Sequence, residues 1–304
     1  MSSSPLPLPE IVKQPMRRVR DRLLLGILNR LDAMGAELAQ ARAVNAKLAE
    51  RMVRLEKLLT GTAADRPPGA SAAVRTSGDP GVAVVLTTYN RARFVGEAIE
   101  SVLAQRLSAW EMVVVDDGST DETAEVVRGF LTDRRIRYLR QENAGSSVAR
   151  NAGIAATTAP LVAYLDDDNL WYPDFLYRAV DLFATAAEVD FAYAALVTDL
   201  HGEDRRILWE PFDRAALERA NYIDTNVIVH RRQLIDRYGG WDPAMSETND
   251  WDLALRMTRD RPAFALDVLG ARYRECDDRR LTSRRTERVG KAPQPLATES
   301  PGAI

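Results

Sequence analysis

The sequence predicts an α/β protein built on a largely parallel central sheet that is covered by helices. Short, continuous apolar runs alternate with segments of helical apolar spacing between residues 82 and 187. Strands that are apolar throughout are typical of parallel sheets buried on both faces. In addition, polar clusters directly follow three of the apolar runs, and ligands of such sheets bind beyond the carboxyl ends of the strands.

The elements are expected in the following order. The runs expected to form strands are 82–87, 112–115, 136–139 and 161–165, and the intervening helices are expected at 94–105, 121–131, 146–156 and from Pro173 to about residue 187. Ser119 or Thr120 is the expected N-cap of the second helix. Further on, strands are expected at 191–198 and 226–230, with helices at 213–220, at 231–237 and from Asp250 onwards.

The chain divides into five expected regions. Residues 1–16 and the tail 277–304 are expected to be disordered, 17–60 to form a coiled-coil helix, 61–80 to be a flexible linker and 81–276 to be the folded domain.

The expected coiled coil depends on a seven-residue repeat. One seam position holds Leu24, Leu31 and Leu38, and it continues through Asn45, a residue that favours a defined register. This pattern predicts a homo-oligomer. The alternatives are an amphipathic helix packed on its own domain, or one lying on a membrane surface through the arginines of residues 17–22.

Composition excludes several classes of protein. The net charge of -3 gives no case for nucleic-acid binding, and the single cysteine, Cys276, excludes an intrachain disulfide and a cysteine zinc cluster. No apolar run approaches the ~20 residues of a membrane span, and no signal peptide is recognisable. We therefore expect a cytoplasmic protein whose membrane contact, if it has one, is peripheral at the inner face.

The strongest single candidate site is an acidic triplet. Asp166, Asp167 and Asp168 directly follow the apolar run 161–165. On an extended chain Asp166 and Asp168 would point the same way, and two hard oxygen ligands suit Mg²⁺ or Mn²⁺. The alternative is an acidic surface turn.

Two other polar clusters are expected to meet this triplet. The sequence TYNR occupies residues 88–91 after the first strand, and DDGS occupies 116–119 after the second. The carboxyl ends of parallel strands share one edge of the sheet, so we expect a single crevice there.

Five motifs together resemble family 2 glycosyltransferases, which have the GT-A fold. They are TTYNRARFVGEAIESVLAQ, VVVDDGSTDET, QENAGSSVARNAGI, YLDDDNLWYP and GGWDPAMSETNDWDLALR, and they span roughly residues 82–267. The resemblance implies a GT-A domain with a Rossmann-like sheet, a nucleoside-diphosphate sugar donor, Mg²⁺ or Mn²⁺ as cofactor, and inversion at the anomeric carbon. The implied acceptor is a saccharide, a lipid-linked molecule or a small molecule with a free hydroxyl.

The resemblance also implies roles for individual residues. The nucleotide sugar would be bound by Thr88, Tyr89, Asn90, Arg91, Asp116, Asp117, Arg150, Asp166 and Asp167, the metal by Asp166 and Asp168, and Asp250 would be the catalytic base. Two positions depart from the family pattern: Asn169 stands where a further Asp is frequent, and Asn249 where Glu is common. Glu247 is a possible substitute for the base.

Simpler explanations exist for several of these residues. Asp116 could be a turn residue, Arg150 a surface arginine, and Asp250 a helix-terminal charge. Trp241 could pack or stack on a sugar, and His230 could be structural or a metal ligand. For the whole protein the alternatives are a nucleotidyltransferase, which the glycine-free loop TTYNRA disfavours, and a catalytically decayed domain that serves as a coiled-coil scaffold.

Overall fold

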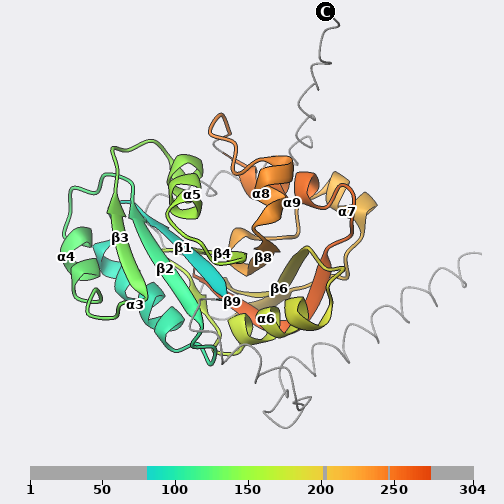
Figure 1. The fold of residues 1–304 in the computed structure, drawn as a ribbon, viewed down its shortest axis with the longest axis horizontal. Helices are drawn as coiled ribbons and strands as arrows, with labels where there is room; N and C mark the ends of the chain where they lie inside the picture. Colours follow the sequence, from blue (N-terminus) through green and yellow to red (C-terminus); the bar gives the residue numbers. More distant parts are fainter. Residues whose placement is uncertain (1–80, 201–203, 246, 275–304) are drawn as a thin grey trace, which may run out of the picture. The chain divides into compact units, whose positions relative to one another are not determined.

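The computed structural model describes residues 81–200, 204–245 and 247–274 (Figure 1). The predicted coiled coil, the linker, both predicted disordered ends and Cys276 lie outside the described residues. Within them, no helix is both long enough and apolar enough to cross a membrane.

The first half of the domain is the predicted alternation of strands and helices. It comprises the strands β1 (Val82–Thr88), β2 (Trp110–Asp116), β3 (Ile136–Arg140) and β4 (Leu161–Asp166), and the helices α3 (Ala92–Leu103), α4 (Thr123–Arg128) and α5 (Ser146–Ala155). The strands pair in parallel in the order β3-β2-β1-β4. This half therefore confirms the expected parallel sheet.

The second half makes the sheet mixed, although it is still mostly parallel. Its strands are β5 (Leu170–Trp171), β6 (Phe191–Leu200), β7 (Asp204–Leu208), β8 (Ile228–Arg231) and β9 (Phe264–Arg274). β8 pairs antiparallel with both β4 and β6, whereas β9 runs parallel to β6. β5, β7 and β9 were not expected from the sequence. β9 has an irregular mixture of buried, intermediate and exposed positions, so a search for continuous apolar runs does not detect it.

The remaining helices are α6 (Phe175–Thr185), α7 (Arg214–Arg219), the 3-10 turn η1 (Thr225–Val227), α8 (Gln233–Tyr238) and α9 (Asn249–Met257). In Figure 1, α5, α8 and α9 lie on one side of the sheet, and α3 and α6 on the other. Two local expectations are wrong. The N-cap of α4 is Glu122, not Ser119 or Thr120, and Pro173 precedes α6 instead of lying in its first turn.

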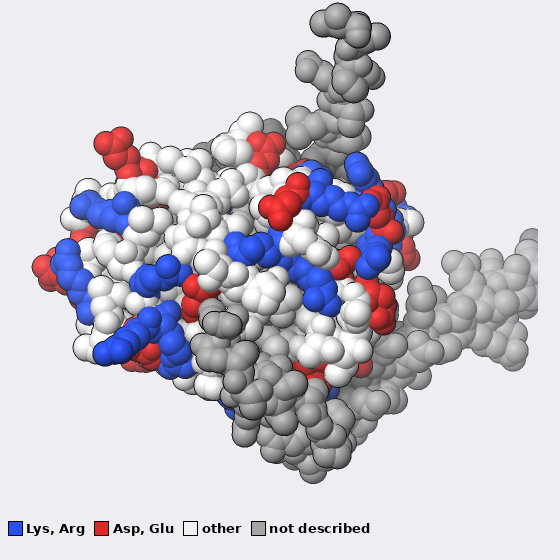
Figure 2. Space-filling model, viewed as in Figure 1, with Lys and Arg blue, Asp and Glu red and all other residues white. Residues whose placement is uncertain are grey.

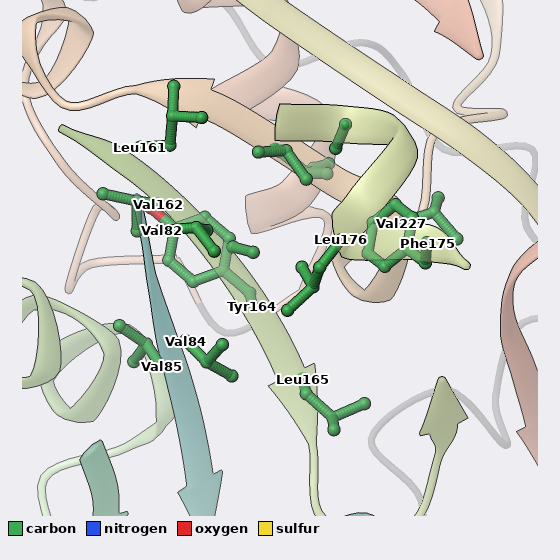
Figure 3. Packing of buried hydrophobic residues seen from close by; sticks show 14 of the residues in the cluster. Val82, Val84, Val85, Leu161, Val162, Tyr164, Leu165, Phe175, Leu176 and Val227 are labelled. Atoms are coloured by element: carbon green, nitrogen blue, oxygen red, sulfur yellow. The ribbon is translucent and has the colours of Figure 1, made fainter. Parts of the chain in front are cut away.

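The core lies where β1 and β4 run side by side (Figure 3). All residues of β1 are buried, so this strand is covered on both faces. The strands contribute Val82 and Val84 from β1 and Leu161 and Leu165 from β4. Phe175 and Leu176 approach them from α6. Burial on both faces explains why these strands have no polar alternation.

The surface carries charges of both signs. Figure 2 shows basic and acidic side chains interspersed over the face in view. This distribution agrees with the nearly balanced composition of 41 basic and 44 acidic residues.

Gly153 allows α5 to approach the sheet closely. A Cβ atom at this position would lie 2.4 Å from Val85 Cγ1 and 3.1 Å from Val115 Cγ2. We expect Gly153→Ala to lower the free energy of unfolding by about 1–3 kcal/mol, because the added methyl group overpacks the interface. Urea unfolding followed by circular dichroism measures this change.

Gly96 provides a matched control inside α3. A Cβ atom there would lie 3.4 Å from Val126 Cγ1, an ordinary contact. Gly96→Ala is expected to be neutral or to stabilise by up to ~1 kcal/mol through helix propensity. Equal destabilisation by the two variants would contradict the steric explanation.

Candidate active site

The loop after β1 is fastened to the loop after β2. Asn90 adopts a left-handed conformation with φ 54°. Its backbone N–H donates to Ser119 Oγ at 2.9 Å, and Thr120 N–H donates to Asn90 Oδ1 at 2.7 Å. Arg91 N–H donates to Thr123 Oγ1 at 3.0 Å. The two predicted polar clusters therefore form one rigid rim, from which the Tyr89 side chain projects with 47% exposure.

The register of the sheet places the triplet beside this rim. Thr88 pairs with Asp116 across β1 and β2, and Thr87 pairs with Asp166 across β1 and β4. The end of β1 is therefore flanked by acidic residues on both sides, as the sequence predicts.

Asp116 is fully buried below the rim. Its carboxylate accepts hydrogen bonds from Ser119 N–H at 2.7 Å and from the Tyr138 hydroxyl. Burial, together with the bond to Asp116, raises the pKa of Tyr138 to about 12. These contacts support the alternative role of Asp116 as a turn residue.

Asp117 holds the loop that leads into α5. Its carboxylate accepts hydrogen bonds from Gln141 Nε2 at 2.7 Å, Ala144 N–H at 2.9 Å and Gly145 N–H at 2.8 Å. An ionised carboxylate has about four acceptor positions, so Asp117 retains capacity for one further donor, such as a base N–H.

Arg150 joins α5 to the end of β4. Its Nη2 donates to Asp166 Oδ1 at 2.7 Å, and its guanidinium lies 4.4 Å from the Trp241 ring centroid. Arg150 is therefore not a surface arginine. Trp241 is 1% exposed and packs edge-on against Tyr164, so its ring is a packing group and offers no surface for sugar stacking.

The acidic triplet is a turn and not an extended strand. β4 ends at Asp166, and Asn169 N–H donates back to the Asp166 carbonyl at 3.1 Å. The extended-chain argument for a common direction of Asp166 and Asp168 is therefore wrong. Asp167 points inward and is buried, with Arg91 Nε 4.0 Å away. Burial, and then the neighbouring Asp168, raises the pKa of Asp167 to about 8.

The end of β9 supports this turn from behind. Arg274 Nε donates to the Asp168 carbonyl at 2.7 Å, and Arg274 N–H donates to Asn169 Oδ1 at 3.1 Å. Asn169 is buried, which accounts for an amide at this position. Sequence reasoning missed Arg274, because β9 itself was not expected.

The chemistry of this turn suits a divalent cation that takes only one or two ligands from the protein. Among the described residues, no group of three or more His, Cys, Asp or Glu side chains is arranged to hold a metal ion. Mg²⁺ characteristically uses one or two carboxylates together with waters and substrate phosphates. Asp166, whose side chain is 30% exposed, and Asp168 are the carboxylates suited to this, and a cation on Asp166 would compete with Arg150.

Asp250 lies at the start of α9. Its carboxylate accepts a hydrogen bond from Trp251 N–H at 2.8 Å, and the preceding Asn249 donates to Ser147 Oγ at 3.1 Å, which ties α9 to α5. Glu247, the alternative base, is exposed in the loop before the helix.

Asp224 is a neighbour of Asp250 that sequence reasoning missed. Burial first, and then the charges of Asp250 and Asp166, raise the pKa of Asp224 to about 6. These two carboxylates come from different elements, α9 and β4, and both act on Asp224.

His230 is structural. It is fully buried, its Nδ1 donates to the Arg231 carbonyl at 2.9 Å, and its Nε2 lies 2.8 Å from the Tyr164 hydroxyl. Both ring nitrogens are thus used inside the protein, which leaves none for a metal.

Comparisons with known proteins identify the family of this chain. The model of the family described as glycosyl transferase family 2 matches residues 83–238. An uncharacterized glycosyltransferase of Nostoc sp. is 34% identical over 176 residues, which cover 53% of this chain and 54% of that protein. Protein CgeD of Bacillus subtilis is 28% identical over 215 residues, 64% of this chain and 50% of that protein. The chain thus spans about half the length of these curated relatives.

Solved structures show the same fold at low sequence identity. TarS 1-349 of S. aureus, in complex with UDP-GlcNAc, has a TM-score of 0.58 at 17% identity and covers 66% of this chain and 60% of its own. The mannosyltransferase PcManGT from Pyrobaculum calidifontis, in complex with GDP-Man and Mn²⁺, has a TM-score of 0.52 at 22% identity. The match covers 76% of this chain and 65% of the PcManGT chain. The domain therefore has a GT-A-like α/β fold.

Proposed function

Because the chain belongs to glycosyl transferase family 2, we propose that it is a glycosyltransferase that moves a sugar from a nucleoside-diphosphate donor to an acceptor hydroxyl with inversion. The observation that carries this proposal is the register at the carboxyl edge of the sheet. There the end of β1 lies between Asp116 on β2 and Asp166 on β4. Arg150 from α5 reaches into the same edge.

The nucleotide would occupy the rim formed by residues 88–91 and the turn after β2. Asp117 has acceptor capacity for a base N–H, and the half-buried Arg91 lies near the triplet, where it can meet a diphosphate. The Arg150 guanidinium would form an ion pair either with Asp166 or with the diphosphate. The structures of TarS with UDP-GlcNAc and of PcManGT with GDP-Man support a donor of this class.

Asp166 and Asp168 would hold Mg²⁺ or Mn²⁺. When bound, such an ion supplies Lewis-acid neutralisation of the charge that develops on the departing diphosphate. The Mn²⁺ in the PcManGT complex supports this assignment.

Asp250 would take the proton of the acceptor hydroxyl. An alcohol is a poor nucleophile at neutral pH, and a carboxylate within hydrogen-bond reach removes its proton as the new bond forms. Attack from the side opposite the diphosphate inverts the anomeric centre. The acceptor class, the homo-oligomer through residues 17–60 and the cytoplasmic location remain predictions from the sequence.

Thermal unfolding with nucleotides tests this proposal. We expect UDP or GDP together with Mn²⁺ to raise the melting temperature, because a ligand of the folded state stabilises by about 2.7 kcal/mol at 100 times its Kd. The matched controls are uridine or guanosine with Mn²⁺, which lack the diphosphate, and each nucleotide with EDTA.

Two outcomes would count against it. If neither nucleotide shifted the melting temperature, the donor site would be refuted. Binding without hydrolysis or transfer of UDP-GlcNAc or GDP-mannose over long incubation would instead favour the decayed scaffold.

A further inference from the structure

Asn226 lies at the point where the donor side of the site meets Asp224. It belongs to η1, is fully buried, and uses its whole amide group in hydrogen bonds. Asp166 N–H donates to Asn226 Oδ1 at 2.7 Å, and Asn226 Nδ2 donates to Asp166 Oδ2 at 3.1 Å and to Asp224 Oδ1 at 2.8 Å.

We infer that Asn226 is a positioning residue that fixes the Asp166 carboxylate for donor binding. This inference rests on the proposed function. Asp166 is held from two sides, because Arg150 binds its Oδ1 and Asn226 binds its Oδ2. Where a cation competes with Arg150 for Oδ1, Asn226 still holds Oδ2, so the donor and its cation meet a carboxylate of fixed orientation.

Only a side-chain amide satisfies this position. Its oxygen accepts from the Asp166 backbone, while its nitrogen donates to two carboxylates at once. A carboxylate would keep the acceptor but lose both donated bonds, and it would place a further negative charge beside Asp166 and Asp224. An aliphatic side chain would leave the partly buried Asp166 N–H without its partner, which is costly.

The position of Asn226 is itself fixed. Its backbone N–H donates to Asp224 Oδ1 at 2.9 Å, and its carbonyl accepts a hydrogen bond from Trp171 Nε1 at 2.8 Å. Asn226 Nδ2 therefore links the Asp166 and Asp224 carboxylates from a fixed position.

Asn226→Asp tests the inference, with Gln105→Glu as the matched control. Gln105 is likewise a buried amide with three hydrogen bonds: Nε2 donates to the Ser101 and Tyr172 carbonyls, and Oε1 accepts from Leu176 N–H. Both variants change an amide into an acid in the interior. They differ in that all three bonds of Gln105 go to backbone groups, whereas Asn226 Nδ2 donates to two site carboxylates.

Isothermal calorimetry with UDP plus Mn²⁺ and with GDP plus Mn²⁺ measures donor-site affinity without turnover. We expect Asn226→Asp to weaken binding of the accepted nucleotide by about tenfold or more. Gln105→Glu is expected to lower the melting temperature while leaving the Kd unchanged. Asn226→Ala removes all three side-chain hydrogen bonds without adding charge, and it is expected to weaken binding in the same direction, which keeps the test valid if Asn226→Asp does not fold.

The outcomes separate this inference from the proposed function. An unchanged Kd in a folded Asn226 variant, or equal losses in the Asn226 and Gln105 variants, would overturn the positioning role alone. If the unmodified protein bound neither nucleotide, the proposed function would fail and this inference would fail with it.

Discussion

Asp250→Asn is expected to reduce the rate of sugar transfer by about 10²- to 10⁴-fold while leaving donor affinity nearly unchanged. The size follows from the usual contribution of a positioned general base. An asparagine amide has nearly the same shape as the carboxylate but cannot take a proton from the acceptor. Steady-state kinetics gives kcat, and calorimetry with nucleotide plus Mn²⁺ gives the donor affinity.

The neighbouring acids serve as controls for this experiment. Glu247 is exposed in the loop before α9, and Asp252 is ion-paired with Arg256 at 2.6 Å on the same helix. Glu247→Gln and Asp252→Asn are expected to keep most of the activity. A full loss in Glu247→Gln with activity retained in Asp250→Asn would transfer the role of base to Glu247. Equal losses of turnover and donor affinity in Asp250→Asn would refute the role altogether.

Acidification is expected to remove about 3 kcal/mol of folding free energy through His230 alone. Burial lowers the pKa of His230 from 6.5 to about 4. The unfolded chain therefore binds a proton near pH 6.5, whereas the folded protein resists protonation until about pH 4. The stabilisation is present above pH 6.5 and is lost as the pH falls towards 4, at about 1.4 kcal/mol per pH unit.

His230→Gln isolates this contribution. Asp167 and Asp224 have raised pKa values, so they favour the folded state as the pH falls, and they act in the opposite direction. Both the unmodified protein and His230→Gln contain these two aspartates, so their effect cancels in the difference between the two unfolding free energies. We expect this difference to shrink between pH 6.5 and pH 4, as measured by urea unfolding at each pH. A constant difference would contradict the assignment.

The sequence predicts the first half of the fold well, because β1, β2 and β4 are buried on both faces. β1 and β4 are continuous apolar runs with polar residues after them, so their length and ends are visible in the sequence. The second half is less visible. β5 has only two residues, and β9 mixes buried with exposed positions. Neither pattern differs enough from that of a loop.

The site is predictable to the extent that strand order determines it. The sequence placed Asp117, Asp166 and Arg150 at the carboxyl edge of the sheet. The strand register and the Arg150–Asp166 ion pair show that the ends of β1, β2 and β4 meet α5 there. Asn226 and Arg274 were missed, because an interior amide and an arginine carry no signal of their own. Each acquires its role only through contact with a residue at least 60 positions away along the chain.

The place of β9 in the sheet has a consequence for protein synthesis. β9 lies between β6 and β5, and its last residue, Arg274, holds the turn of the acidic triplet. A ribosome that has made only the parallel half exposes a nascent chain whose triplet lacks this support. The turn of the acidic triplet therefore gains this support only late in translation, after residues 264–274 have been made and have paired with β6.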